Sequence, residues 1–145
     1  MKIYLDTNVF NRPFDDQTQP RIILETQALR TILKLIEMGN IELMSSSVLA
    51  YENSRNTSPV RQKWVHQCLA LATTSQPLQN TIIQRAKALE QTGLKTIDAL
   101  HVATAEAAQC EVFLTCDDRL LRRYSGPLRA MNPVTLVLEL TEVSE

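Results

Sequence analysis

The chain has 145 residues, of which 44% are hydrophobic and 21% are charged. A chain of this length buries roughly 70% of its unfolded surface, and we expect one globular domain over residues 1–145. The net charge of −1 excludes nucleic-acid binding through bulk positive charge. The sequence has no apolar run of about 18 residues, so we expect no membrane span.

Apolar runs and turn residues divide the first half of the chain into short elements. The expected order is a strand over residues 2–5, a polar loop over 11–20, a helix from Arg21 that stops at Gly39, a strand over 41–45, and a helix over 46–56 capped by Ser46 or Ser47. The helix that begins at Arg21 carries apolar residues at three- and four-residue spacing, which is typical of an amphipathic helix.

The second half repeats the alternation. The expected order is a helix over residues 60–71, a strand over 71–75, a helix over 78–93, a helix over 97–110 capped by Thr96, a strand over 112–115, a short helix over 119–124, a strand over 134–140, and a frayed tail over 141–145. Strands that alternate with helices predict a parallel sheet covered by helices on both faces. The nearly continuous apolar strands agree, because a parallel sheet is buried on both sides.

Acidic residues follow these strands at the edge where such sheets bind ligands. Asp6 ends the first strand, and Asp117 follows the fourth, with Asp118 beside it. Glu52 lies in the helix that leaves the second strand. Asp98 lies in the first turn of the helix that leads into the fourth strand. Because that helix must begin at the same edge, Asp98 is expected there too. The topology therefore predicts that acids from distant parts of the chain converge there.

Converging carboxylates repel one another unless a cation neutralises them. The chain has only two histidines and three cysteines, with no Cys-x-x-Cys pair, which excludes a His-rich zinc site and favours a reduced, cytoplasmic protein. An oxygen-only site suits a hard cation, Mg²⁺ or Mn²⁺. Such an ion activates water and stabilises charge on a phosphate, so phosphodiester hydrolysis is the expected chemistry.

The motifs "YLDTN", "KTIDALHVATA" and "FLTCDD", with Glu52 between the first two, resemble the PIN-domain ribonucleases, including the VapC-type toxins of toxin–antitoxin pairs. The resemblance implies a three-layer α/β/α sandwich with a parallel five-stranded sheet of order 3-2-1-4-5. It implies Mg²⁺- or Mn²⁺-dependent endonucleolytic cleavage of RNA. It also implies a small antitoxin partner and a homodimer.

By this resemblance, the catalytic acids map onto Asp6, Glu52, Asp98 and Asp117, with Asp6, Asp98 and Asp117 binding the metal. The polar positions beside them are Asn8 and Thr115. Either Asp117 or Asp118 faces the metal, and the place of Asp117 after Thr115 favours Asp117. Further contacts to substrate or partner are expected from Arg12 and Arg119.

Other interpretations stay open. A PIN-like module that binds RNA or protein without catalysis would keep the same acids. A phosphatase that forms an aspartyl phosphate on Asp6 is a third hypothesis, although it would need a second aspartate where this chain has Asn8. We expect His101 to be a packed or hydrogen-bonded histidine rather than a general base. Trp64 is expected in a core or dimer contact.

Overall fold

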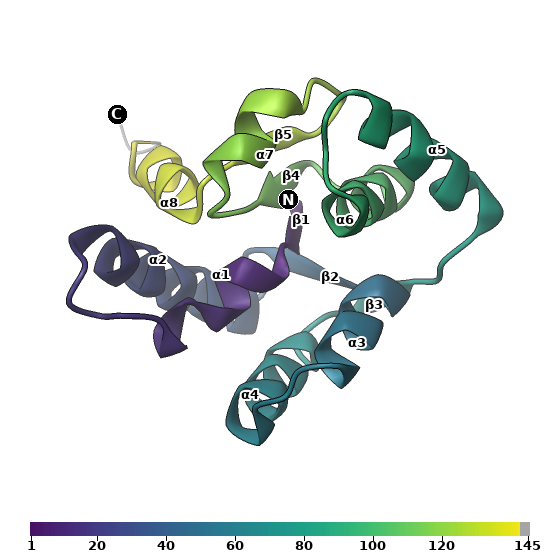
Figure 1. The fold of residues 1–145 in the computed structure, drawn as a ribbon. Helices are drawn as coiled ribbons and strands as arrows, with labels where there is room; N and C mark the ends of the chain where they lie inside the picture. The colour runs from purple at the N-terminus through teal and green to yellow at the C-terminus, as the bar shows by residue number, and fades with distance from the viewer. Residues whose placement is uncertain (143–145) are drawn as a thin grey trace.

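The structure is a computed structural model that describes residues 1–142. It contains a five-stranded sheet of order β3-β2-β1-β4-β5, in which every pair of neighbours is parallel (Figure 1). The strands are β1 (Lys2–Leu5), β2 (Glu42–Ser46), β3 (Thr74–Gln76), β4 (Val112–Leu114) and β5 (Arg129–Met131). The predicted fold class and strand order are therefore confirmed.

Helices connect the strands and cover both faces of the sheet. They are α1 (Thr7–Asn11), the 3-10 helix η1 (Arg12–Phe14), α2 (Pro20–Glu37), α3 (Ser47–Ser54), α4 (Pro59–Leu69), α5 (Asn80–Gln91), α6 (Thr96–Ala107), α7 (Asp118–Arg123) and α8 (Pro133–Thr141). Helices α2 and α8 pack together on one side of the sheet, and α5 and α6 pack together on the other (Figure 1).

The core is centred on β1 and β4, which lie side by side in the middle of the sheet. Their side chains from Ile3 to Leu5 and from Val112 to Leu114 are fully buried. Helix α6 presents buried Ala99, Ala103 and Ala105. Because alanine side chains are small, this helix can approach the sheet closely. The two central strands therefore hold the residues that follow them at fixed positions.

The strand predicted over residues 134–140 is wrong. This segment belongs to helix α8, and the fifth strand is Arg129–Met131, which sequence inspection did not assign. Asn132 caps the helix by accepting a hydrogen bond from the Val134 amide at 2.8 Å, and Pro133 occupies the first turn, where proline is well tolerated. Pro133 and Leu136 are buried, so the apolar run presents one helical face to α2.

Three smaller predictions also differ from the structure. The polar loop over residues 11–20 contains η1, and α1 precedes it without having been predicted. Thr96 is the first residue of α6 rather than its cap, and its hydroxyl donates to Glu90. Of the tail predicted to fray, Thr141 ends α8, and residues 143–145 lie outside the described part of the chain.

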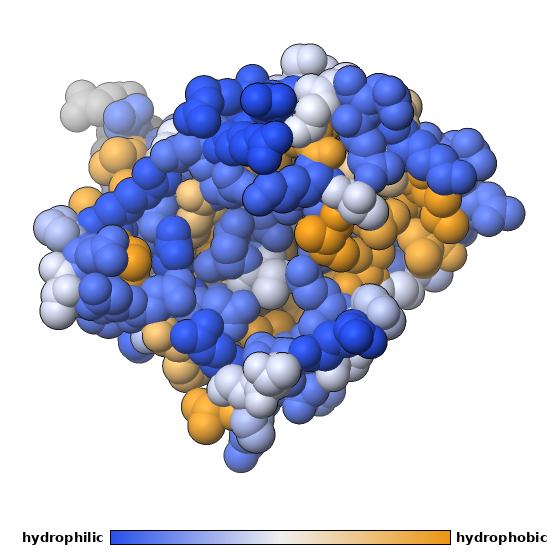
Figure 2. Space-filling view, in the orientation of Figure 1, coloured by the Kyte–Doolittle hydropathy of each residue, from blue (hydrophilic) through white to orange (hydrophobic). Residues whose placement is uncertain are grey.

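Hydrophilic residues cover most of the face drawn in Figure 2, and hydrophobic residues appear there in small groups. Within residues 1–142, no helix is long and apolar enough to cross a membrane. Cys68, Cys110 and Cys116 are buried free thiols, and burial raises the pKa of Cys110 to about 11. Trp64 packs against the core as predicted, and its indole N–H donates to the Phe10 carbonyl at 2.7 Å.

Candidate functional site

Asp6 lies at the carboxyl end of β1, where β1 and β4 end together. Leu5 pairs with Leu114, and the Asp6 amide donates to the Leu114 carbonyl at 2.9 Å. The Asp6 carboxylate also caps helix α1 by accepting from the Thr7 amide at 2.8 Å. The sharp change from strand to helix therefore holds a buried carboxylate at the edge of the sheet.

Thr115 and Asn8 orient this carboxylate. The Thr115 hydroxyl donates to Asp6 Oδ2 at 2.9 Å, and the Asn8 amide donates to the same oxygen at 3.1 Å. The other end of the Asn8 side chain accepts from the Cys116 amide at 3.0 Å. Both residues therefore tie the end of β1 to the end of β4. Burial, the largest cause, raises the pKa of Asp6.

Asp117 and Asp118, which sequence could not separate, have different surroundings. Asp117 caps α7 by accepting hydrogen bonds at Oδ1. Its backbone amide donates to the Thr115 hydroxyl oxygen at 3.1 Å. Asp118 is exposed and forms two hydrogen bonds with Arg21, at 2.7 and 2.8 Å. This pairing lowers the pKa of Asp118. Asp118 is thus engaged by a cation of the chain itself.

Asp98, in the first turn of α6, lies within electrostatic reach of the other two aspartates. Its pKa is raised to about 6, first by burial and then by the negative charges of Asp6 and Asp117. Asp6, which follows β1, and Asp117, which follows β4, are therefore close enough for their charges to act on Asp98. Their charges are unfavourable to one another in the protein alone.

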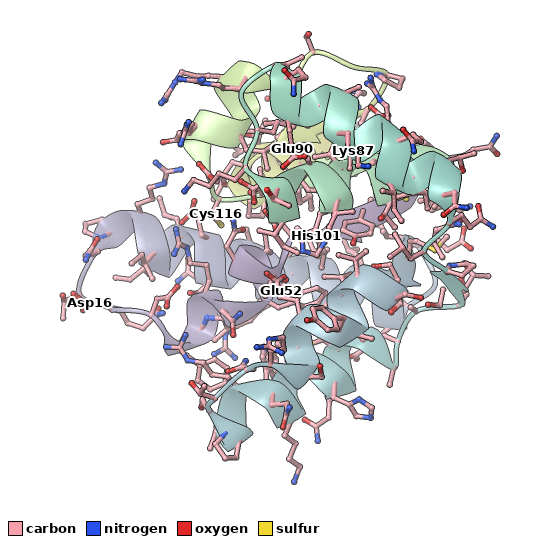
Figure 3. The ribbon with its side chains drawn as sticks, turned by 45° about the vertical axis from the view of Figure 1, so that its right-hand side comes forward. Asp16, Glu52, Lys87, Glu90, His101 and Cys116 are labelled. Carbon is pink, nitrogen blue, oxygen red and sulfur yellow. The ribbon has the colours of Figure 1, made fainter. Side chains whose placement is uncertain are left out.

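Glu52 on α3 also faces this edge, but hydrogen bonds hold it. Its Oε1 atom accepts from the Thr7 hydroxyl and lies 2.8 Å from His101 Nε2. Figure 3 shows Glu52 and His101 next to each other. Burial opposes the charge of Glu52, but the bonds to His101 and Thr7 outweigh it and lower its pKa. His101 is buried and hydrogen-bonded, as predicted.

Arg12 is paired with two carboxylates of the chain. It donates from Nε to Glu25 at 2.9 Å and from Nη1 to Asp15 at 2.9 Å. Glu25 is fully buried and also accepts from Arg21 at 3.1 Å and from the Asn132 amide. By contrast, Arg119 is exposed, and no ion pair involves it within residues 1–142.

Sequence inspection missed the network around Glu25. The feature of the sequence that could have indicated this network is Glu25 itself, an acid between Ile22 and Leu29 on the apolar face of α2. Tyr4 and Thr7 were also missed as partners of the site, although both lie within the "YLDTN" motif. A buried acid on an apolar helix face indicates a paired charge, but the sequence does not say which cation pairs with it.

The donor set at this edge consists of carboxylate and hydroxyl oxygens. No group of three or more Asp, Glu, His or Cys side chains within residues 1–142 is arranged to hold a metal ion by itself. Mg²⁺ requires fewer protein ligands than that, because it commonly binds one or two carboxylates and keeps several waters. The oxygen donors at this edge are of the kind that a hard divalent cation prefers.

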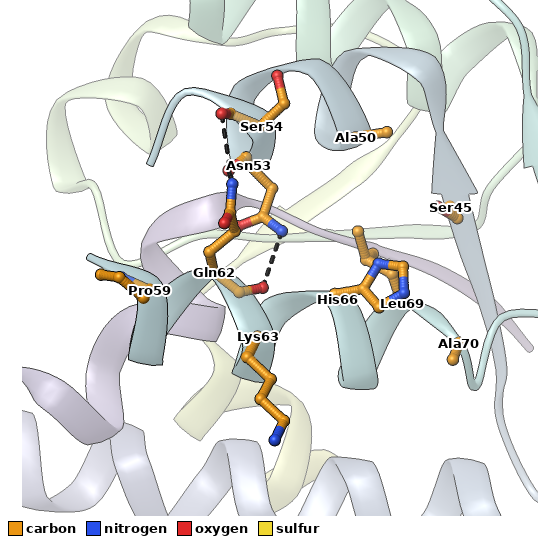
Figure 4. A pocket seen from close by; sticks show the side chains of 10 residues that line it. All are labelled: Ser45, Ala50, Asn53, Ser54, Pro59, Gln62, Lys63, His66, Leu69 and Ala70. Carbon is orange, nitrogen blue, oxygen red and sulfur yellow. Dashed lines mark hydrogen bonds between the residues drawn. The ribbon is translucent and has the colours of Figure 1, made fainter. Parts of the chain in front are cut away.

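A groove of about 580 Å³ lies elsewhere, between α3 and α4. Figure 4 shows Asn53, Gln62, Lys63 and His66 in its wall, with the amide of Asn53 bonded to the carbonyl of Gln62. Of the residues that the structure describes, the four candidate acids contribute nothing to this wall. The groove and the acidic edge are separate features.

The sequence matches the PIN domain family over residues 3–126, most of its length. The chain therefore belongs to the PIN domain family, and the resemblance predicted from its motifs is confirmed. A comparison with curated proteins finds no match.

Solved structures with the same fold include VapBC toxin–antitoxin complexes. VapBC2 from Rickettsia felis, bound to a DNA fragment from its promoter, is 19% identical with a TM-score of 0.58, over 91% of this chain and 98% of that chain. DNA-bound VapBC from Salmonella typhimurium is 16% identical with a TM-score of 0.59, over 92% and 98%. VapBC-1 from nontypeable Haemophilus influenzae is 14% identical with a TM-score of 0.54, over 92% and 98%.

Proposed function

We propose that this protein is a metal-dependent endoribonuclease. The observation that best supports the proposal is the raised pKa of Asp98, caused by burial and by the charges of Asp6 and Asp117, the residues that follow β1 and β4. Their mutual repulsion favours a bound cation. Mg²⁺ or Mn²⁺ bound there would activate water and stabilise charge on a phosphate.

The residues around the aspartates divide the remaining work. Thr115 and Asn8 hold Asp6 in one orientation by bonds of 2.9 and 3.1 Å to Oδ2. Glu52, whose ionised form is favoured by hydrogen bonds to Thr7 and His101, would accept a proton from an attacking water. Exposed Arg119, next to the site in sequence, is available to contact a phosphate of the RNA.

Two alternatives receive less support. The aspartyl-phosphate reaction needs a second acid at the position of Asn8, and an amide cannot supply a proton as an acid does. Both ends of the Asn8 amide are also occupied, by hydrogen bonds to Asp6, Thr115 and Cys116. A non-catalytic RNA- or protein-binding module would have no need for a half-buried Asp98 whose pKa is raised by burial and by neighbouring carboxylates. That interpretation becomes the expected one only if the cleavage test fails.

We extend the proposal to the biological role. VapBC complexes are among the similar solved structures, which supports a toxin that is held by a small antitoxin. The homodimer is proposed from the family resemblance. Buried free thiols fit a reducing compartment, so we propose a cytoplasmic location. A short reading frame beside this gene, whose product relieves growth arrest caused by this protein, would test the antitoxin partner.

The direct test is incubation of the purified protein with a mixed pool of structured RNA, in Mg²⁺, in Mn²⁺ and in EDTA. We expect cleavage in the two metal lanes, none in EDTA, and none with Asp98→Asn. Asp16→Asn is the matched control, because Asp16 is an exposed turn residue bonded to Thr18. Wild-type cleavage by Asp98→Asn, or absence of cleavage by the wild type with either metal, would refute the proposal.

A further inference from the structure

A chain of buried hydrogen bonds runs from Glu52 beneath the site. His101 Nε2 lies 2.8 Å from Glu52 Oε1, and His101 Nδ1 lies 2.8 Å from the Tyr4 hydroxyl. The Tyr4 hydroxyl lies 2.8 Å from Ser46 Oγ, which accepts from the Leu49 amide at 3.0 Å. The chain thus joins α3, α6, β1 and β2, and His101, Tyr4 and Ser46 are almost completely buried.

When the His101 ring carries a single proton, the hydrogens of this chain fit well in only one direction. Since the Leu49 amide donates to Ser46, the Ser46 hydroxyl can donate to Tyr4, and Tyr4 can then donate to His101 Nδ1. A ring with a single proton then carries it on Nε2, where it donates to the Glu52 carboxylate. Every hydrogen in the chain has an acceptor.

The opposite direction is unfavourable at both ends. If Nδ1 donated to Tyr4, the Nε2 lone pair of His101 would face the Glu52 carboxylate, which repels it. At the other end Ser46 Oγ would accept from Tyr4 as well as from Leu49, and no described residue accepts its own buried hydrogen. A buried donor without a partner is costly.

We propose that His101 is a positioning residue for Glu52: Tyr4 selects the Nε2-protonated ring, and the Nε2–H bond fixes the Glu52 carboxylate toward the aspartates. The proposal rests on the proposed nuclease function. Glu52 needs such a support because it stands on the short helix α3 with its side chain 31% exposed. A glutamate side chain with free rotamers would lose its orientation.

Tyr4→Phe is the variant that separates positioning from packing. The Tyr4 ring stacks on Phe113 with centroids 5.5 Å apart, and phenylalanine keeps this contact. Tyr124→Phe is the matched control, because it also removes a hydroxyl bonded to a carboxylate, that of Glu106 at 2.6 Å. Tyr124 takes no part in the chain below Glu52.

The state of the ring is measured by nitrogen NMR of ¹⁵N-labelled histidine at alkaline pH. The chain has two histidines, and His66 is exposed, so a His66→Gln background leaves His101 as the single signal. We expect a proton on Nε2 and none on Nδ1, and we expect Tyr4→Phe to give a mixture of the two forms. An Nδ1-protonated ring in the His66→Gln protein would overturn the proposal.

Kinetics supplies the second measurement. We expect Tyr4→Phe to lower kcat for RNA cleavage roughly five- to tenfold, the effect of losing one orienting hydrogen bond. KM and the Kd for Mn²⁺ should stay unchanged, because Asp6, Asp98 and Asp117 are untouched, whereas general loosening of the fold would weaken Mn²⁺ binding too. Tyr124→Phe should keep the wild-type kcat.

A substitution series at His101 covers the possibility that Tyr4→Phe folds poorly. His101→Gln can still present an N–H to Glu52, so it should retain more activity than His101→Leu. Equal kcat values for the two, or a wild-type kcat for Tyr4→Phe, would overturn the proposal. If the wild type cleaves no RNA, the nuclease function itself fails, and the NMR spectrum still decides the orientation of the ring.

Discussion

Asp98 bears a charge that the folded protein holds at a cost. Its pKa is about 6 instead of the ordinary 3.8, because of burial and of the charges on Asp6 and Asp117. That difference corresponds to about 3 kcal/mol. Solvent screening of a half-buried carboxyl and the favourable dipole at the start of α6 reduce it to about 1 kcal/mol. We therefore predict that Asp98→Asn stabilises the metal-free protein.

The sign of this effect depends on pH. A carboxyl with a raised pKa lowers stability only when it is ionised in the fold, so the cost is absent below the unfolded pKa of 3.8 and complete above about 6. In EDTA at about pH 7, Asp98→Asn should raise Tm by roughly 3 °C, and at about pH 4 the gain should become small.

The assay is thermal unfolding followed by circular dichroism, with Asp16→Asn as the control. Asp16 is exposed, and its hydrogen bonds to Thr18 lower its pKa, so its loss should leave Tm equal to or slightly below that of the wild type. If Asp98→Asn unfolds at or below the wild-type temperature in EDTA near pH 7, the claim that the cluster is self-repelling is wrong.

Three further predictions concern the metal and the supports of the fold. Mn²⁺ at about 100 times its Kd should stabilise the wild type by about 2.7 kcal/mol, and Asp98→Asn should gain much less. Glu25→Gln should lower the free energy of unfolding measured in urea by about 3 kcal/mol, because it disrupts a buried carboxylate paired with Arg12 and Arg21. Glu139→Gln, the control in an exposed ion pair, should lower it by less than about 1 kcal/mol. Asn132→Ala should cost at least about 1 kcal/mol, read from the same urea curves, because it removes the α8 cap and the hydrogen bond to buried Glu25.

The predictions for Mn²⁺ and for Glu25→Gln each have a result that contradicts them. Equal Mn²⁺ stabilisation of wild type and Asp98→Asn would remove Asp98 from the metal site. Equal urea midpoints for Glu25→Gln and Glu139→Gln would mean that the buried ion pairs add nothing to stability. Because the pKa of Glu25 is lowered in the fold, its contribution should also fade in acid; a cost of Glu25→Gln that is constant with pH would argue against a charge effect.

The sequence by itself determined the parallel sheet and the edge at which Asp6 and Asp117 lie. Short apolar strands such as Lys2–Leu5 alternate with amphipathic helices such as α2, and this alternation permits few topologies. Asp6 and Asp117 follow strands directly, so their positions depend only on where the chain leaves the sheet. Local pattern and connectivity were sufficient for both.

Only the tertiary structure decided what depends on neighbours distant in sequence. The segment over residues 134–140 is almost wholly apolar, so its period could not distinguish strand from helix, and packing against α2 made it helix α8. Asp118 was separated from Asp117 by Arg21, which lies 97 residues away in the chain. His101 is hydrogen-bonded at both ring nitrogens because β1 and α3 bring Tyr4 and Glu52 to the two sides of one imidazole ring.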